Sequence, residues 1–143
     1  MKVVLDTNVL VSGLLTPYGP PGEIVRTVFA GKLSLCMDAR ILLEYEEVLH
    51  RPKFQFDSDN IDILIDFIKR NGHFFSAPPL RNPLPDSDDE PFIEVARAAG
   101  ADALITGNLA HFPSDRREGV VVVSPSTFLD DYRNNLGHTG YPA

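Results

Sequence analysis

The chain has 143 residues, with 20 acidic against 13 basic side chains and a formal net charge of −7. This length is that of one domain with a substantial apolar core. The negative charge excludes a protein that holds nucleic acid over a broad basic surface, so a polyanionic substrate would need a local basic patch or metal ions. The lone cysteine, Cys36, excludes an internal disulfide and suits a reducing cytoplasm, and no apolar run approaches the length of a membrane span.

The first predicted element is a buried strand at residues 3–5, where β-branched and apolar residues follow one another. Asp6 stops this run, and Thr7 and Asn8, which commonly begin helices, lead into the apolar helical pattern of residues 9–15. An ionised side chain at the end of a buried strand is costly unless it has a metal, a partner or a catalytic role. Two interpretations of Asp6 stay open: a ligand site at the carboxyl end of a strand, or a plain helix cap.

Helices and strands alternate along the rest of the chain. Helical spacing of apolar residues predicts further helices at 23–30, 38–51, 57–70, 91–100 and 126–136. Short apolar runs predict strands at 33–37, 103–106 and 120–124, with a short edge strand at 73–76. This alternation predicts a three-layer α/β/α fold, with a central parallel sheet of about four to five strands. We expect a single domain over residues 1–136 and a C-terminal tail at 137–143.

A second acidic segment, residues 86–90, leads directly into the helix that ends at Gly100. Helical geometry places Asp89 on the same face as the apolar residues of that helix, so its carboxylate is expected to point toward the sheet. We therefore interpret Asp89 as a functional residue. Asp86 and Asp88 have a simpler explanation as helix caps or as residues that support the site from behind.

The helix that begins at Asp38 carries three glutamates. Helical geometry turns Glu47 away from the apolar face, so Glu47 is expected to be solvated. Glu44 and Glu46 flank the apolar face on either side, and periodicity alone does not choose between them.

Acidic and polar side chains thus follow several predicted strands at the point where each strand ends. Asp6, Asp89 and one of the two glutamates are expected to converge with Thr106 and Asn108, which follow the strand at 103–106. Clustered carboxylates repel one another, and such a cluster is stable when it shares protons or binds cations. Because oxygen ligands favour hard cations, the expected metal is Mg²⁺ or Mn²⁺ rather than zinc.

Four segments of the chain carry a resemblance to a known family. In order they are LDTNVLVSG, LLEYEEVLHRPKF, DSDDEPFIEVARAAGADALITGN and VVVVSPSTFL, and together they resemble a PIN-domain protein. The most similar group is the predicted toxin components of bacterial and archaeal toxin–antitoxin pairs. The resemblance implies a parallel sheet flanked by helices and metal-dependent cleavage of RNA. We accordingly expect RNA and a protein antitoxin as partners, and copies of the chain itself as a third.

The resemblance also implies roles for particular residues. Asp6, Glu44 and Asp89 match the acidic metal ligands of the family, and this match favours Glu44 over Glu46.

Other polar residues match the family less completely. Asn8 and Thr106 fit its supporting polar positions. The family usually has a fourth acid after the Thr-Gly of the later strand, where this chain has Asn108. One neutral oxygen at this position predicts a weak metal ligand or a weak second metal site.

Basic residues near the site are candidates for contact with the RNA backbone, foremost Arg51 and Lys53; the competing interpretation is an ordinary solvated surface. The histidines lack the spacing of metal ligands and are expected to be surface residues: His50, His73, His111 and His138.

Two other classes of protein compete with an active nuclease. The first is a PIN fold that has lost catalysis and serves as a nucleic-acid-binding or scaffold module, an alternative that Asn108 keeps open. The second is a phosphoacceptor receiver, which also gathers acids around Mg²⁺ at strand ends. A receiver needs adjacent acids after its first strand and a late lysine, but Asp6 stands alone and no lysine follows Lys69.

Overall fold

In a computed structural model, residues 1–136 are described, and they contain a five-stranded parallel sheet. The strands in chain order are β1 (Lys2–Leu5), β2 (Ser34–Met37), β3 (His73–Phe74), β4 (Ala103–Ile105) and β5 (Val122–Val123). They lie in the order β3-β2-β1-β4-β5, and every neighbouring pair is parallel. The predicted parallel sheet is confirmed. The predicted tail at 137–143 lies outside the described residues.

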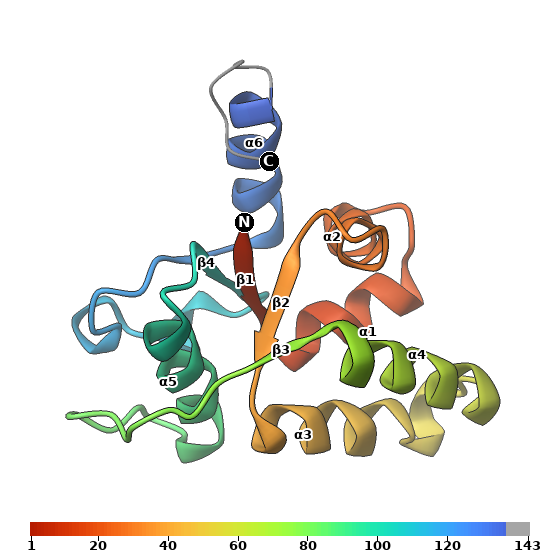
Figure 1. Ribbon diagram of the computed structural model, residues 1–143, viewed down its shortest axis with the longest axis horizontal. Coiled ribbons are helices and arrows are strands. Elements are labelled where there is room, and N and C mark those ends of the chain that lie inside the picture. Colours follow the sequence, from red (N-terminus) through yellow and green to blue (C-terminus); the bar gives the residue numbers. More distant parts are fainter. Residues whose placement is uncertain (137–143) are drawn as a thin grey trace.

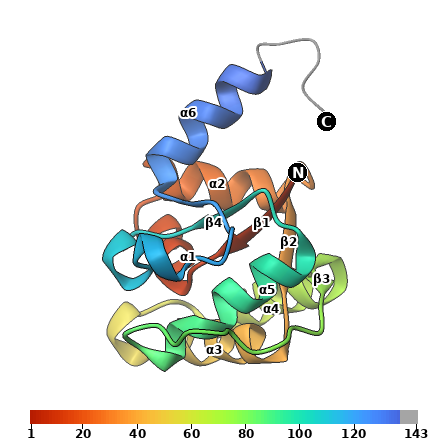
Figure 2. The same cartoon turned by 90° about the vertical axis from the view of Figure 1, so that its left-hand side faces the viewer.

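Helices cover both faces of the sheet (Figures 1 and 2). In chain order they are α1 (Thr7–Leu15), α2 (Pro20–Phe29), α3 (Ala39–Leu49), α4 (Ser58–Asn71), α5 (Glu90–Ala99) and α6 (Pro125–Leu136). Helix α5 packs on β1, β2 and β4 from one side, while α1 and α2 lie together on the other side, with α6 against α2. This arrangement confirms the predicted three-layer α/β/α fold. None of the described helices is long and apolar enough to cross a membrane.

Some elements differ in length from the prediction, for local reasons. Helix α2 begins at Pro20 rather than at residue 23, because proline is well suited to a first helical turn. The edge strands β3 and β5 have two residues each, because they pair only with the last two residues of their neighbours β2 and β4. Within residues 1–136, four 3-10 helices add short turns: Pro52–Phe54, Ser87–Asp89, Leu109–His111 and Ser114–Arg116.

Strand β1 lies at the centre of the sheet and explains where the site forms. Its residues 3–5 are at most 1% exposed, as expected of a strand covered on both faces. Strands β2 and β4 flank it, so the strand order reverses at β1, and such a switch point opens a crevice at the carboxyl ends of the strands. Leu5 pairs with Ile105, so the two residues that follow, Asp6 and Thr106, lie side by side at this edge.

Tyr45 fastens helix α3 to the end of β1. Its side chain is fully buried, and its hydroxyl donates a hydrogen bond of 2.6 Å to the carbonyl oxygen of Leu5. Leu5 precedes Asp6 and Tyr45 follows Glu44 in the chain. This bond therefore fixes the positions of Asp6 and Glu44, two of the predicted metal ligands, relative to each other.

The Tyr45→Phe variant tests this anchor. It should lose about 1 kcal/mol of unfolding free energy, because the buried carbonyl of Leu5 loses a hydrogen-bond donor while the packing volume stays nearly the same. Urea unfolding of the metal-free protein measures the loss. Tyr18→Phe is the control, since Tyr18 is 98% exposed. Equal stability of the two variants would contradict the anchoring role.

Candidate functional site

Asp6 is the buried carboxylate of the site, with 5% of its surface exposed. Its Oδ2 accepts hydrogen bonds from the Thr106 hydroxyl at 2.8 Å and from the Asn8 side-chain amide at 3.2 Å. The Asp6 side chain does not make the hydrogen bond of a helix N-cap, so the plain-cap interpretation does not describe it. Burial raises the pKa of Asp6, and the hydrogen bond from Thr106 opposes this shift.

Thr106 and Asn8 connect Asp6 to the loop that follows β4. The Thr106 hydroxyl oxygen accepts a hydrogen bond of 3.0 Å from the Asn108 amide, and the Asn8 side-chain oxygen accepts one of 3.1 Å from the Gly107 amide. A Cβ atom at Gly107 would lie 3.3 Å from that oxygen, so glycine permits the close approach. Both predicted supporting residues therefore contact Asp6 directly.

Glu44 lies on α3 and faces the same edge of the sheet. The Thr7 hydroxyl donates a hydrogen bond to Glu44 Oε2. Burial raises the pKa of Glu44, and the negative charges of Asp6 and Asp88 raise it further, while the bond from Thr7 opposes the shift. Thr7 was expected only as a residue near a helix start, and its contact with Glu44 was not predicted because it joins residues far apart in the sequence.

The neighbouring glutamates point elsewhere. Glu46 Oε2 lies 3.9 Å from Lys69 Nζ on α4, and Glu47, whose side chain is 72% exposed, lies 3.1 Å from Arg51 Nη2. The structure therefore places Glu44, and neither of the other two, beside Asp6.

Asp89 ends the 3-10 helix before α5. Its side chain is 13% exposed, and its Oδ2 atom is buried and has no hydrogen-bond partner in the described residues. Burial raises the pKa of Asp89 to about 6, and the charge of Asp6 raises it as well. A buried carboxylate oxygen that accepts no hydrogen bond is costly, which makes this atom a strong candidate for a cation ligand.

Asp86 and Asp88 are exposed and lie beside the site rather than in it. The Asp86 carboxylate accepts a 2.9 Å hydrogen bond from the Asp88 amide, so it caps the 3-10 helix that positions Asp89.

His111 is a site residue that the sequence did not reveal. Its side chain is 48% exposed, as expected of a surface residue, yet its Nδ1 lies 3.4 Å from Asp89 Oδ2. Its Nε2 lies 2.9 Å from the side-chain nitrogen of Asn108. Asn108 and His111 are three residues apart on a 3-10 turn, and side chains at this spacing align. This spacing is the feature of the sequence that could have indicated His111 as a site residue. His50 and His73 are exposed and distant in sequence from these contacts, and His138 lies outside the described residues.

The donor chemistry of the site fits a hard divalent cation. Asp6, Glu44 and Asp89 supply only carboxylate oxygens, and the charge of Asp6 raises the pKa values of both Glu44 and Asp89. Asp89 offers an oxygen that accepts no hydrogen bond from the described residues. Within residues 1–136, however, no group of three or more acidic, histidine or cysteine side chains is placed so as to hold a metal ion. An open arrangement is expected of carboxylates that repel one another, so the residues fit the metal by chemistry and charge rather than by a finished geometry.

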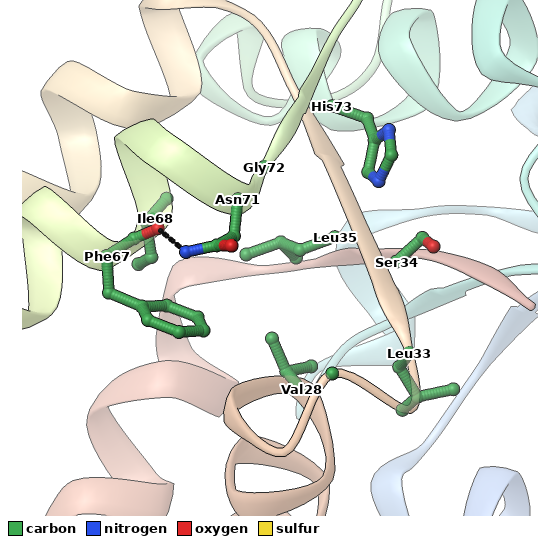
Figure 3. Close-up of a pocket in the computed structure, with 10 residues that line it drawn as sticks. Val28, Leu33, Ser34, Leu35, Phe67, Ile68, Asn71, Gly72 and His73 are labelled. Atoms are coloured by element: carbon green, nitrogen blue, oxygen red, sulfur yellow. Dashed lines mark hydrogen bonds between the residues drawn. The ribbon is translucent and has the colours of Figure 1, made fainter.

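A separate cavity of about 190 Å³ lies at the amino end of β2, between α2 and α4 (Figure 3). Leu35, Phe67 and Ile68 line it together with the polar side chains of Ser34, Asn71 and His73. No carboxylate lines it in the described part of the chain, so it offers no alternative metal centre.

Known proteins resemble this chain in sequence and in fold. Residues 2–110 match the model of the PIN domain family. An uncharacterized protein of Methanocaldococcus jannaschii is 32% identical over 114 residues, which cover 76% of this chain and 71% of that protein.

Three solved structures share the fold. A chain of VapBC2 from Rickettsia felis, bound to a DNA fragment from their promoter, has a TM-score of 0.59 at 17% identity and covers 87% of this chain and 98% of its own. A chain of FitAB bound to the IR36 DNA fragment has a TM-score of 0.59 at 14% identity, covering 86% of this chain and 94% of its own. A chain of FitAcB from Neisseria gonorrhoeae has a TM-score of 0.54 at 15% identity, covering 87% and 98%.

The raised pKa of Asp89 makes stability depend on pH. Its pKa is about 6 in the folded protein against 3.8 ordinarily, so between these values the folded state holds more protons and stability falls as pH rises. Asp89→Asn removes this loss. With metal chelated, the variant should match the wild type near pH 4 and exceed it above pH 6 by roughly 1–2 kcal/mol, after allowance for solvent screening. Urea unfolding across this range measures the difference, and a difference independent of pH would contradict the assignment.

Proposed function

The chain belongs to the PIN domain family, and we propose on this basis that it is a metal-dependent endoribonuclease. Nuclease activity is general in this family. The observation that carries the proposal is the buried Oδ2 of Asp89, which accepts no hydrogen bond from the described residues and lies at an edge of the sheet shared with Asp6 and Glu44. Such an atom among repelling carboxylates favours binding of a cation.

In this proposal Asp6, Glu44 and Asp89 hold Mg²⁺ or Mn²⁺. When bound, such a cation lowers the pKa of a water molecule and neutralises negative charge on a phosphodiester. The chain's own residues prepare the site: Thr106 orients Asp6, and Thr7 orients Glu44. Asn108 is at most a weak additional ligand, because its side chain offers one neutral oxygen; its amide nitrogen lies 2.9 Å from His111 Nε2.

RNA is the proposed substrate, and Arg51 and Lys53 are the proposed contacts to its backbone. Both are exposed and follow directly after α3, the helix that carries Glu44. Arg51 is paired with the exposed Glu47, and Lys53 Nζ lies 5.0 Å from the centre of the Phe54 ring. Because these contacts are exposed and weak, Arg51 and Lys53 can release them to bind phosphate.

We further propose that the protein is the toxin of a toxin–antitoxin pair, with a protein antitoxin as its partner and association with its own copies. The support is the likeness in fold to chains of the VapBC2 and FitAB complexes.

A second candidate is a PIN fold that binds nucleic acid or a protein without cleaving RNA. The observation that favours it is Asn108, which stands where the family usually has an acid and whose side chain is turned to His111. A cleavage assay on purified protein distinguishes the two candidates.

The proposed roles predict which acids matter for cleavage. Asp6→Asn, Asp89→Asn and Glu44→Gln should each lower Mn²⁺-dependent cleavage of a mixed RNA pool by at least about a hundredfold, because each removes a charged metal ligand. Glu46→Gln and Glu47→Gln are the matched controls on α3 and should stay within about twofold, since such surface changes rarely matter. Gel analysis of the products, with identification of 5′-phosphate ends, measures both. Full activity of Glu44→Gln would refute the ligand assignment.

A further inference from the structure

An ion pair with a buried carboxylate joins α3, the helix that carries Glu44, to α5, the helix that directly follows Asp89. Arg40, in the first turn of α3, donates from Nη1 to Oε1 of Glu94 on α5 at 2.7 Å. Glu94 is 5% exposed, whereas the Arg40 side chain is 48% exposed. Burial of a carboxylate is costly, so Glu94 requires the partners that surround it.

Both ends of this pair are held by further bonds. The Nε and Nη2 atoms of Arg40 donate to Oδ2 of Asp38 at 2.9 and 2.7 Å, and Oδ1 of Asp38 accepts from the Ile41 amide at 3.1 Å as the cap of α3. The second oxygen of Glu94 accepts from the Leu80 amide at 3.0 Å. The guanidinium is thus held between two carboxylates on different elements, which leaves it a single orientation.

The pair lies close to the proposed metal ligands along both helices. Arg40 stands four residues before Glu44, one helical turn away on the same face, and Glu94 stands five residues after Asp89. The negative charges of Glu44 and Asp89 repel and act to push α3 and α5 apart, while the opposite charges of Arg40 and Glu94 act to draw them together.

We propose that Arg40 and Glu94 are positioning residues that set the separation of Glu44 and Asp89, and through it the affinity of the site for a divalent cation. The proposal rests on the function proposed above, since it takes these two acids as metal ligands. A buried ion pair contributes little net stability, because the cost of desolvation offsets the attraction between the charges. Its effect is therefore expected in the geometry of the site more than in the stability of the fold.

The chain offers a matched control on the same helix. Arg97 of α5 forms an ion pair with Glu118, and their side chains are 26% and 14% exposed. Glu118 precedes β5, so this pair lies at the amino edge of the sheet, opposite to the edge where Asp89 lies. Arg97→Gln breaks this half-buried ion pair of α5, together with the bonds from Arg97 Nη2 to the carbonyl oxygens of Pro78 and Pro79. It leaves the direct bond between Arg40 and Glu94 in place, so it is a control for disturbance of α5 and of the segment before Leu80.

The test is Mn²⁺ binding by isothermal titration calorimetry, without RNA. Glu94→Gln and Arg40→Gln should each weaken Mn²⁺ affinity roughly tenfold, as loss of residues that orient metal ligands commonly does. Arg97→Gln should stay within about twofold of the wild type, because it leaves the bond between Arg40 and Glu94 in place. Arg40→Lys should fall between, since an ammonium group cannot bridge both carboxylates with the geometry of a guanidinium. Equal affinity in Glu94→Gln and Arg97→Gln overturns the proposal.

Two further measurements keep the test decisive. The double variant Arg40→Met/Glu94→Met leaves no unpaired buried charge and should fold, yet should still bind Mn²⁺ more weakly; wild-type affinity in this variant overturns the proposal. The positioning proposal is also overturned if Mn²⁺ affinity is unchanged in both single variants while Arg40→Gln raises the KM for RNA. In that case Arg40 contacts the substrate instead. If the wild type does not bind Mn²⁺, the proposed function itself is overturned. If the wild type binds Mn²⁺ and the variants bind it equally well, only the positioning role is overturned.

Discussion

Mutual repulsion among Asp6, Glu44 and Asp89 is the constraint on which the site depends. Burial raises the pKa of each carboxyl, and like charges raise the pKa values of Glu44 and Asp89 further. The folded chain must therefore hold these side chains together against their repulsion. Hydrogen bonds from Thr106 and Thr7 hold two of the three. The third keeps an oxygen without a hydrogen-bond partner in the described residues. A bound cation would remove both costs at once, which connects the strain of the site to its proposed chemistry.

Much of the fold was predictable because local patterns and topology agree. The apolar run before Asp6 is a central strand, and the segment after it is a helix. Alternating strands and helices favour a parallel sheet, and the structure adds the strand order, which no local pattern contains. The lengths of β3 and β5 were overestimated because they are limited by the strands beside them, which is a tertiary property.

The site was predictable where the signal is local and hidden where it is not. The inward orientation of Asp89 was predicted from helical geometry. Periodicity could not separate Glu44 from Glu46, whose side chains meet Thr7 of α1 and Lys69 of α4, respectively. The family resemblance resolved that choice. The contact of His111 with Asp89 and the pairing of Arg40 with Glu94 join distant parts of the chain, so no spacing rule for a single segment could reveal them.

The most direct test is a crystal soaked in Mn²⁺, with diffraction recorded at the manganese absorption edge. The account predicts an anomalous peak between the carboxylates of Asp6, Glu44 and Asp89, with Asp89 Oδ2 among the ligands and with the Thr106 bond to Asp6 retained. A peak elsewhere in the molecule, or none at a Mn²⁺ concentration that supports RNA cleavage, would contradict it.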